Sequence, residues 1–329
     1  DHRDLHSFPT RRSSDLAFVL SLLASCASPS STVVPTDAET ETLEAASATV
    51  EPTMAEIATT AVPTESPSEV TTATPSALWI SLPVVPEVSP AMIEVFERGL
   101  AAGREPNRFS KIGDCQNITT YFLAMYDGGT YRLGDEYAYL QPTIDYFTGS
   151  WARKSLAVKG GLNVIAVQNP MWTAAVEQYT KKVGTCKKGE TPLVCELRDY
   201  NPSFALISME ESWAGSYDLY DVNMRQIVEY VLSLDIVPIL ATRTETLTQD
   251  RQINDIIVQI AEDYEVPLWN FGAAVASLPD AGKRDNDEFH LTEGRPFFDD
   301  PEMMTKGWPW RNLTALQALD AVSRGVGAQ

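Results

Sequence analysis

Two side chains near the C-terminus have the types and the spacing for acid–base chemistry. The sequence contains three histidines, and two of them, His2 and His6, lie in an N-terminal stretch that matches no structural element, which leaves His290. Imidazole is the side chain whose ordinary pKa makes it a ready proton carrier near neutral pH. Asp287 stands three residues before His290, so in a turn its carboxylate can orient the ring and stabilise its charged form. The pair predicts histidine-based catalysis, and the alternative is a surface loop where both residues meet by chance.

A cysteine is the second candidate for chemistry. Cys115 follows Gly113 and Asp114, directly after a short strand candidate at residues 108–112. Reacting groups in α/β proteins lie at the carboxyl ends of strands, and a thiolate is a strong nucleophile beside a histidine. The alternative is a small buried residue with no chemical role.

Two further cysteines, Cys186 and Cys195, flank a short polar loop in the middle of the chain. In an exported protein this spacing predicts one loop-closing disulfide. Two cysteines without a nearby histidine fall short of the ligand set of a tetrahedral zinc site. We therefore expect a disulfide, no metal site and no other cofactor.

The segment before residue 78 shows no pattern of a folded domain. Residues 1–15 resemble a translated sequencing-adapter remnant, and residues 16–26 resemble a signal peptide whose apolar run is too short to span a bilayer. The run ends in L-A-S-C, which resembles the bacterial lipobox and predicts a lipid on Cys26; an ordinary signal peptide cleaved nearby is the alternative. Residues 27–77 hold eight acidic residues, no lysine, no arginine and no aromatic residue, which predicts a disordered tether.

Composition and charge narrow the class of partner. The chain of 329 residues is 44% apolar, enough for one domain of about 250 residues, which we assign to residues 78–329. The net charge of −20 and the pI near 4.5 argue against a nucleic-acid partner and against a basic membrane-binding surface. We expect a bacterial, extracytoplasmic monomer that is lipid-anchored to the cell membrane or secreted, and that meets the membrane through its lipid alone.

Strand candidates alternate with helix candidates through the rest of the chain. The expected helices cover residues 90–100, 222–234, 250–264 and 312–324, and the expected strands cover residues 108–112, 156–158, 204–209, 237–241 and 266–270. The run 204–209 is almost wholly apolar, as in a parallel strand that is buried on both faces. The alternation predicts a three-layer α/β/α fold with a mainly parallel sheet and right-handed crossovers.

This layout, closing on D-x-x-H, resembles the SGNH (GDSL-type) hydrolase family from about residue 108 to the C-terminus. The family's G-D-S block is matched by Gly113-Asp114-Cys115, with cysteine in place of the nucleophilic serine. Gly161, in K-G-G-L-N, matches the glycine whose backbone N–H helps to form the oxyanion hole. Ser212 stands where the family's G-x-N-D block has the oxyanion asparagine, and the D-x-x-H block is matched by Asp287 and His290.

The resemblance implies a flavodoxin-like fold and the hydrolysis of esters, with acylated carbohydrates or small molecules as the expected substrates. Cys115 would attack the carbonyl carbon, His290 would act as base and Asp287 would orient it, while Gly161 and Ser212 would help to hold the oxyanion. Loss of one oxyanion donor costs about 10²–10³ in rate, so serine at position 212 weakens the expected activity. The alternative function is a carbohydrate- or partner-binding protein that retains the fold without catalysis.

Aromatic residues gather in the sequence just after the D-x-x-H motif. Phe297, Phe298, Trp308 and Trp310 suit the floor of a sugar-binding cleft, and they suit core packing of the last helix equally well. The sequence assigns them no role.

Overall fold

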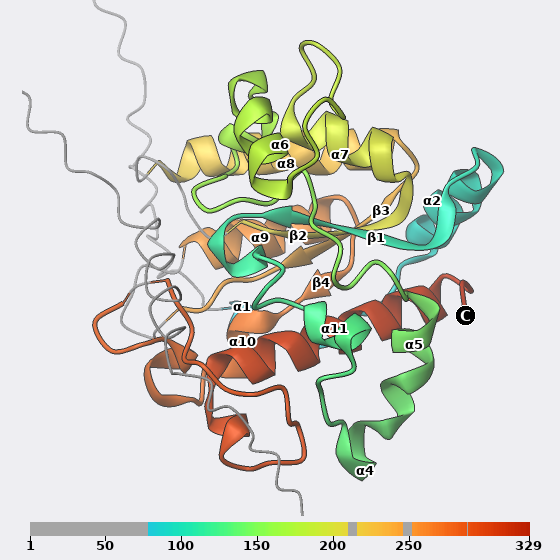
Figure 1. Cartoon of the computed structure of the whole chain (residues 1–329). Coiled ribbons are helices and arrows are strands. Elements are labelled where there is room, and N and C mark those ends of the chain that lie inside the picture. The colour runs from blue at the N-terminus through green and yellow to red at the C-terminus, as the bar shows by residue number, and fades with distance from the viewer. Residues whose placement is uncertain (1–77, 210–215, 246–251, 288) are drawn as a thin grey trace, which may run out of the picture. The chain divides into compact units, whose positions relative to one another are not determined.

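The computed structural model describes residues 78–209, 216–245, 252–287 and 289–329, all within one compact unit (Figure 1). The expected adapter remnant, signal peptide and tether lie outside the described residues, as do Cys26 and Ser212. Among the described residues, no helix has the length and apolar character needed to cross a bilayer.

A four-stranded parallel sheet, in the order β1-β2-β3-β4, forms the centre of the domain. Its strands are β1 (Glu105–Gly113), β2 (Pro202–Ser208), β3 (Val237–Ala241) and β4 (Leu268–Trp269). An isolated parallel bridge between Gly113 and Val158 adds one more segment on the free side of β1. Counting this segment, the order of the strands is that of a flavodoxin-like doubly wound sheet.

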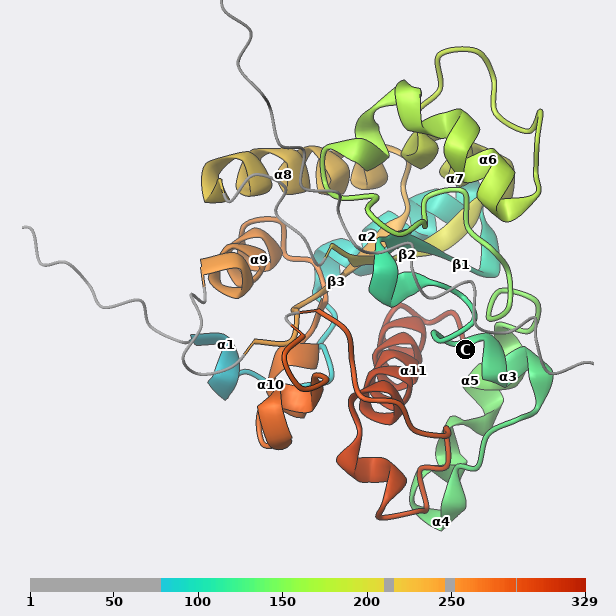
Figure 2. The ribbon, with the colours of Figure 1, turned by 60° about the vertical axis from the view of Figure 1, so that its left-hand side comes forward.

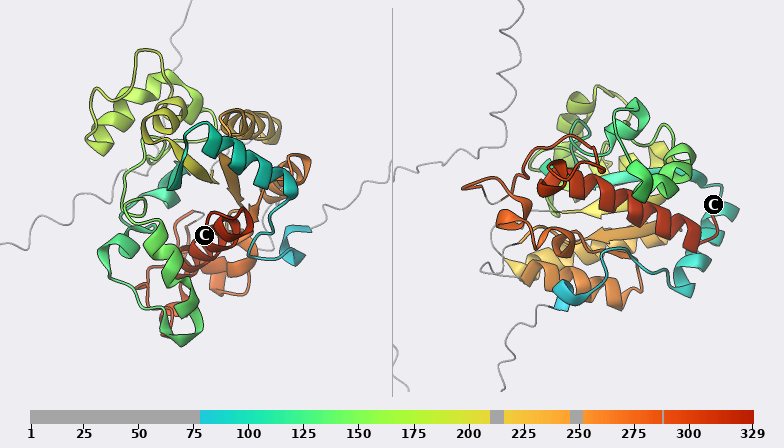
Figure 3. Two further views of the ribbon diagram at one scale, coloured as in Figure 1. Left: turned by 90° about the vertical axis from the view of Figure 1, so that its right-hand side faces the viewer. Right: turned by 90° about the horizontal axis from the view of Figure 1, so that it is seen from below.

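Helices cover both faces of the sheet, so the predicted α/β/α fold with a parallel sheet is confirmed. In Figure 1, α7 and α8 lie on one side of the sheet and α11 lies on the other. Figure 2 shows α8 and α9 side by side, and Figure 3 shows α11 running along one face of the sheet. The helices are α1 (Leu78–Ser81), α2 (Pro90–Ala101), α3 (Ala124–Gly128), α4 (Gly134–Tyr137), α5 (Gln141–Tyr146), α6 (Thr173–Thr180), α7 (Pro192–Tyr200), α8 (Tyr217–Ser233), α9 (Gln252–Asp263), α10 (Phe271–Val275) and α11 (Gly307–Gly325). Short 3₁₀ helices occupy Cys115–Asn117, Ala138–Leu140, Ala166–Gln168, Pro170–Trp172, Pro279–Gly282 and Met303–Thr305.

Local sequence signals explain most of these elements. Every residue of β2 and β3 is buried, as the apolar runs predict for strands covered on both faces. Ser89 caps α2 by accepting a hydrogen bond from the backbone N–H of Met92, with Pro90 in the first turn.

Several element boundaries differ from the expectation, and two of these differences have a clear local cause. The last helix begins at Gly307 rather than at residue 312, because Pro309 lies in the first turn, where a missing N–H costs no hydrogen bond. The strand expected at 266–270 covers only Leu268–Trp269. It ends there because Asn270 caps the start of α10, where its side chain accepts a hydrogen bond from the N–H of Ala273.

Strand β1 carries a buried cation, Lys111, which is only 1% exposed. Its Nζ donates to the carbonyl oxygen of Trp151 at 2.8 Å and to Oγ1 of Thr119 at 3.3 Å. Burial lowers the pKa of Lys111 to about 7, an effect that Arg153 reinforces and Glu196 opposes. Folding therefore holds this ammonium group in a place that favours its neutral form.

We expect Lys111→Met to stabilise the chain by about 1–3 kcal/mol near pH 6, and by less near pH 9. The folded pKa of Lys111 lies below its unfolded value, so between the two values the unfolded chain binds more protons and the wild type gains stability as pH rises. Below the folded pKa the cost of burying the charge is fully present, and methionine removes it. Urea unfolding at both pH values measures the difference in the free energy of unfolding. An equal stabilisation by Lys111→Met at pH 6 and pH 9 would refute the lowered pKa of Lys111.

Candidate active site

The turn that carries Cys115 begins directly beyond the end of β1. A Cβ atom on Gly113 would lie 2.1 Å from both the Ser208 carbonyl oxygen and Nδ2 of Asn117, so only glycine lets the turn fold back over β2. Nδ2 of Asn117 donates to that same carbonyl oxygen at 2.8 Å. Cys115 is half-buried at the carboxyl edge of the sheet and takes part in no disulfide.

Asp287 and His290 form a hydrogen-bonded pair. Nδ1 of His290 lies 2.8 Å from Oδ2 of Asp287, and the backbone N–H groups of Phe289 and His290 each donate to Oδ1 of Asp287 at 2.9 Å. Burial raises the pKa of the Asp287 carboxyl, but the two backbone donors and the imidazole outweigh it and lower that pKa overall. Asp287 is therefore held as a carboxylate, and Nε2 of His290 faces away from it.

One hydrogen bond joins the cysteine turn to the histidine loop. Nε2 of Gln116 donates to the carbonyl oxygen of Phe289 at 2.5 Å, across 173 positions of sequence. Gln116 follows Cys115 directly and Phe289 precedes His290 directly, so the two loops meet at the residues next to the candidate nucleophile and base.

A buried arginine supports the cysteine turn from α11. Arg311 is fully buried; its Nε donates to the Gln116 carbonyl oxygen at 3.1 Å and its Nη2 to Oγ of Ser208 at 2.7 Å. The guanidinium carbon lies 4.9, 5.1 and 4.9 Å from the ring centroids of Phe122, Trp269 and Phe271. Arg311 could not be singled out from the sequence, because nothing local distinguishes an arginine buried among aromatic rings from one on a solvated helix face.

Gly161 follows the segment that pairs with the end of β1. The N–H of Gly113 donates to the Ala157 carbonyl oxygen at 3.0 Å, and the N–H of Lys159 donates to the Gly113 carbonyl oxygen at 3.4 Å. The pairing is parallel, so Gly161 and Cys115 both lie beyond the carboxyl edge of the sheet. Gly161 has a φ of +76°, a left-handed conformation that favours glycine.

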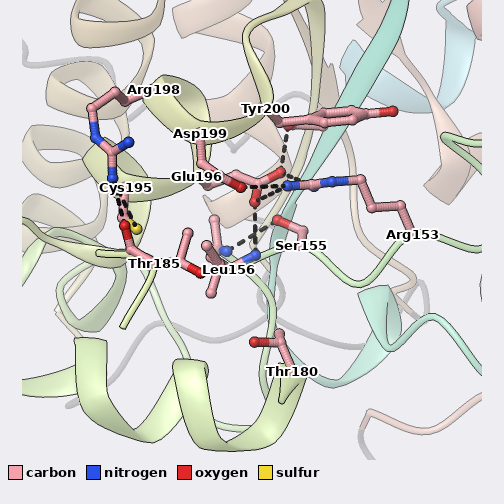
Figure 4. A network of polar contacts seen from close by, with 12 residues as sticks. Arg153, Ser155, Leu156, Thr180, Thr185, Cys195, Glu196, Arg198, Asp199 and Tyr200 are labelled. Carbon is pink, nitrogen blue, oxygen red and sulfur yellow. Dashed lines mark hydrogen bonds and ion pairs between the residues drawn. The ribbon is translucent and has the colours of Figure 1, made fainter. Parts of the chain in front are cut away.

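A buried ion pair fixes this segment to β1 and α7 (Figure 4). Glu196 of α7 is fully buried and accepts from Arg153, from Oγ of Ser110 at 2.6 Å and from the N–H of Leu156 at 2.8 Å. Arg153 also stacks over the ring of Tyr200, 3.7 Å from its centroid. Burial raises the pKa of Glu196, but Arg153, Ser110 and Leu156 outweigh it, and the pKa is lowered overall. Glu196 thus ties the segment before Gly161 to the strand before Cys115.

Glu196→Gln is expected to lower the free energy of unfolding by about 3–5 kcal/mol, because it leaves the charge of Arg153 without its partner. Glu190→Gln is the matched control, since Glu190 pairs with the more exposed Arg198 in the same region, and its loss should cost about 1 kcal/mol or less. Urea unfolding at neutral pH measures both variants. Equal losses for the two would contradict the role given to Glu196.

Cys186 and Cys195 are disulfide-bonded, which confirms the predicted bridge. With Glu190, their sulfurs form the one group of three close metal-type donor atoms among the described residues, but the disulfide leaves neither sulfur as a thiolate ligand. Cys195 directly precedes Glu196 in α7, so the bridge anchors the helix that carries the buried carboxylate.

Four of the five predicted catalytic and oxyanion residues lie in the described part of the chain, and Ser212 does not. Cys115 and His290 belong to loops in direct contact, and Asp287 is hydrogen-bonded to His290. Gly161 follows the segment that pairs with the strand before Cys115. No family model matches the chain, and no curated protein matches it. Membership of the SGNH family therefore stays a prediction from the motifs.

Proposed function

We propose that this chain is an SGNH-type ester hydrolase, with Cys115 as nucleophile and the Asp287–His290 pair as base. The observation that carries the proposal is the hydrogen bond from Gln116 to Phe289, because it joins the residue after the nucleophile to the residue before the base. The hydrogen bond between Asp287 and His290 adds support, since it leaves Nε2 for proton transfer.

In the proposed reaction, His290 takes the proton of the Cys115 thiol, and the sulfur attacks the carbonyl carbon of the ester. The N–H groups of Cys115 and Gly161 hold the resulting oxyanion. Collapse of the intermediate breaks the C–O bond, and the alcohol leaves with the proton from His290. Water, activated by His290, then cleaves the thioester to a carboxylic acid and restores the thiol.

Cysteine chemistry restricts the substrates of this proposed enzyme. A thiolate leaves the tetrahedral intermediate more readily than an amine does, so esters are favoured over amides as substrates. Serine at position 212, in place of the family's asparagine, offers a shorter side chain to the oxyanion, and loss of one such donor costs about 10²–10³ in rate. We therefore propose a slow esterase for small-molecule or carbohydrate esters.

The proposed setting is the outer face of a bacterial membrane. A lipid on Cys26 would anchor the chain, and residues 27–77 would serve as the tether between the anchor and the catalytic domain. Cleavage of an ordinary signal peptide would release the same domain into the medium.

The test is the hydrolysis of para-nitrophenyl acetate by the purified chain, with para-nitroacetanilide as the matched amide. We expect turnover of the ester above the rate in buffer and no turnover of the anilide. Alkylation of the protein with iodoacetamide beforehand should remove the activity. An inactive protein would favour the alternative of a binding protein that retains the fold.

A further inference from the structure

A pocket of about 650 Å³ opens beside the two loops of the candidate active site. One wall comes from residues 120–130, which follow the cysteine turn, and the other from residues 293–308, which follow His290. This volume lies within the range of about 300–1,000 Å³ that is typical of small-molecule sites. Neither Cys115 nor His290 lines the pocket, so it flanks the candidate catalytic groups along the chain rather than containing them.

The walls of the pocket are clamped together by the buried side chain of Asn312 on α11. Its Oδ1 accepts from the N–H of Leu123 at 2.8 Å, and its Nδ2 donates to the carbonyl oxygens of Tyr121 at 3.1 Å and Trp308 at 2.9 Å. Leu123 is held at a φ of +68°, a left-handed conformation that costs a residue with a side chain about 1–3 kcal/mol. Two of these hydrogen bonds, to Leu123 and Tyr121, hold the strained segment to α11, which indicates a preformed wall rather than a loop that settles around its ligand.

An aromatic platform lines this pocket. The ring of Tyr121 stacks on Trp308 with centroids 5.6 Å apart and planes at 23°. Trp308 is 7% exposed and Tyr121 is 38% exposed, so the tyrosine offers a flat surface to solvent while the indole supports it from behind. Flat aromatic rings of this kind pack against the C–H face of a sugar ring.

The rim of the pocket carries polar groups that could hydrogen-bond to the hydroxyl groups of a ligand. Thr120, Thr130 and Arg295 are exposed lining residues. Among the described residues, the guanidinium of Arg295 makes no ion pair and stacks on Phe297 at 4.8 Å, so its five N–H donors are available to a ligand.

We propose that this pocket binds the carbohydrate part of an acylated glycan, with Tyr121 as the platform under a sugar ring and Arg295 as a donor to its hydroxyl groups. The cleavage of such a glycan rests on the proposed esterase function, but the binding of its sugar part does not. Trp308 belongs to this site, whereas Trp310 donates from Nε1 to the Met304 carbonyl oxygen and packs against the core.

The experiment measures binding of xylotetraose, cellotetraose and chitotetraose to the full chain by saturation-transfer difference NMR. We expect at least one of them to bind, and Tyr121→Ala to weaken that binding about fivefold to tenfold, as the loss of one aromatic contact implies. Tyr121→Phe keeps the ring and should bind within about twofold of the wild type. Tyr139→Ala, which removes an exposed tyrosine outside the pocket lining, is the matched control and should bind like the wild type.

The outcomes separate the pocket from the catalysis. Binding that depends on Tyr121 in a protein that hydrolyses no para-nitrophenyl acetate would support the pocket and overturn the esterase. Ester hydrolysis without binding of any of the three tetrasaccharides would overturn the pocket and leave the esterase standing. Equal binding by the Tyr121→Ala and Tyr139→Ala variants would also overturn the pocket.

Discussion

Cys115→Ala is expected to lower kcat/KM for para-nitrophenyl acetate by about 10³-fold or more, which is the scale on which removal of a nucleophile acts. The methyl group cannot form the thioester, and only the remaining oxyanion donors and substrate binding can speed the attack of water. Cys115 is half-buried and outside the disulfide, so alanine removes one sulfur atom without breaking a covalent bond. Initial rates at saturating and at low ester concentration measure the effect.

Cys115→Ser is the matched control for this variant, because it restores the family's usual nucleophile at nearly the same volume. We expect the wild type and the serine variant to hydrolyse the ester, and the alanine variant not to hydrolyse it. Turnover in the serine variant alone would mean that catalysis has been lost from this position in the natural chain. Unchanged turnover in Cys115→Ala would show that the reaction does not pass through this residue.

His290→Ala is expected to slow ester hydrolysis by about 10²–10⁴-fold, the usual contribution of a positioned general base. The same variant should also slow the alkylation of Cys115 by iodoacetamide near neutral pH, since the thiolate forms by proton transfer to His290. Alkylation requires no oxyanion hole, so it reports on the thiol and the base alone. Mass spectrometry of the peptide that contains Cys115 follows this reaction over time.

A matched control for the base is Glu293→Gln, which changes an exposed carboxylate in the same loop. Glu293 pairs with Arg284, whereas the imidazole pairs with Asp287. Its alkylation rate should equal that of the wild type. If His290→Ala and Glu293→Gln are both alkylated at the wild-type rate, Cys115 and His290 share no proton and the binding-protein alternative gains the support.

Patterns within short stretches of sequence determined much of the fold. The apolar runs of β2 and β3 predicted buried strands, and the Ser89–Pro90 pair predicted the start of α2. The spacing of Asp287 and His290 predicted their contact, and Cys186 and Cys195 predicted their bridge. Each of these features depends on neighbours within about ten residues, so it could be predicted from local sequence patterns alone.

Only the tertiary structure decided which distant segments meet. The hydrogen bond from Gln116 to Phe289 crosses 173 positions, and no local pattern indicates that these two residues touch. Glu196 and Arg311 read in the sequence as ordinary charged residues on helices, yet both are fully buried and fix the segments around Cys115. A buried charge is stable only where several donors or acceptors converge on it, and that convergence exists only once the elements have packed.

The aromatic residues after the D-x-x-H motif illustrate the same limit. From the sequence, these residues were equally compatible with the floor of a sugar-binding cleft and with core packing. In the structure, Trp308 lines the pocket beneath Tyr121, whereas Trp310 hydrogen-bonds to the carbonyl oxygen of Met304. Side-chain type sets what a residue can contact, but the register of α11 against the preceding loops sets what it does contact. That register is determined by packing over the whole domain, and for this reason the sequence by itself left it open.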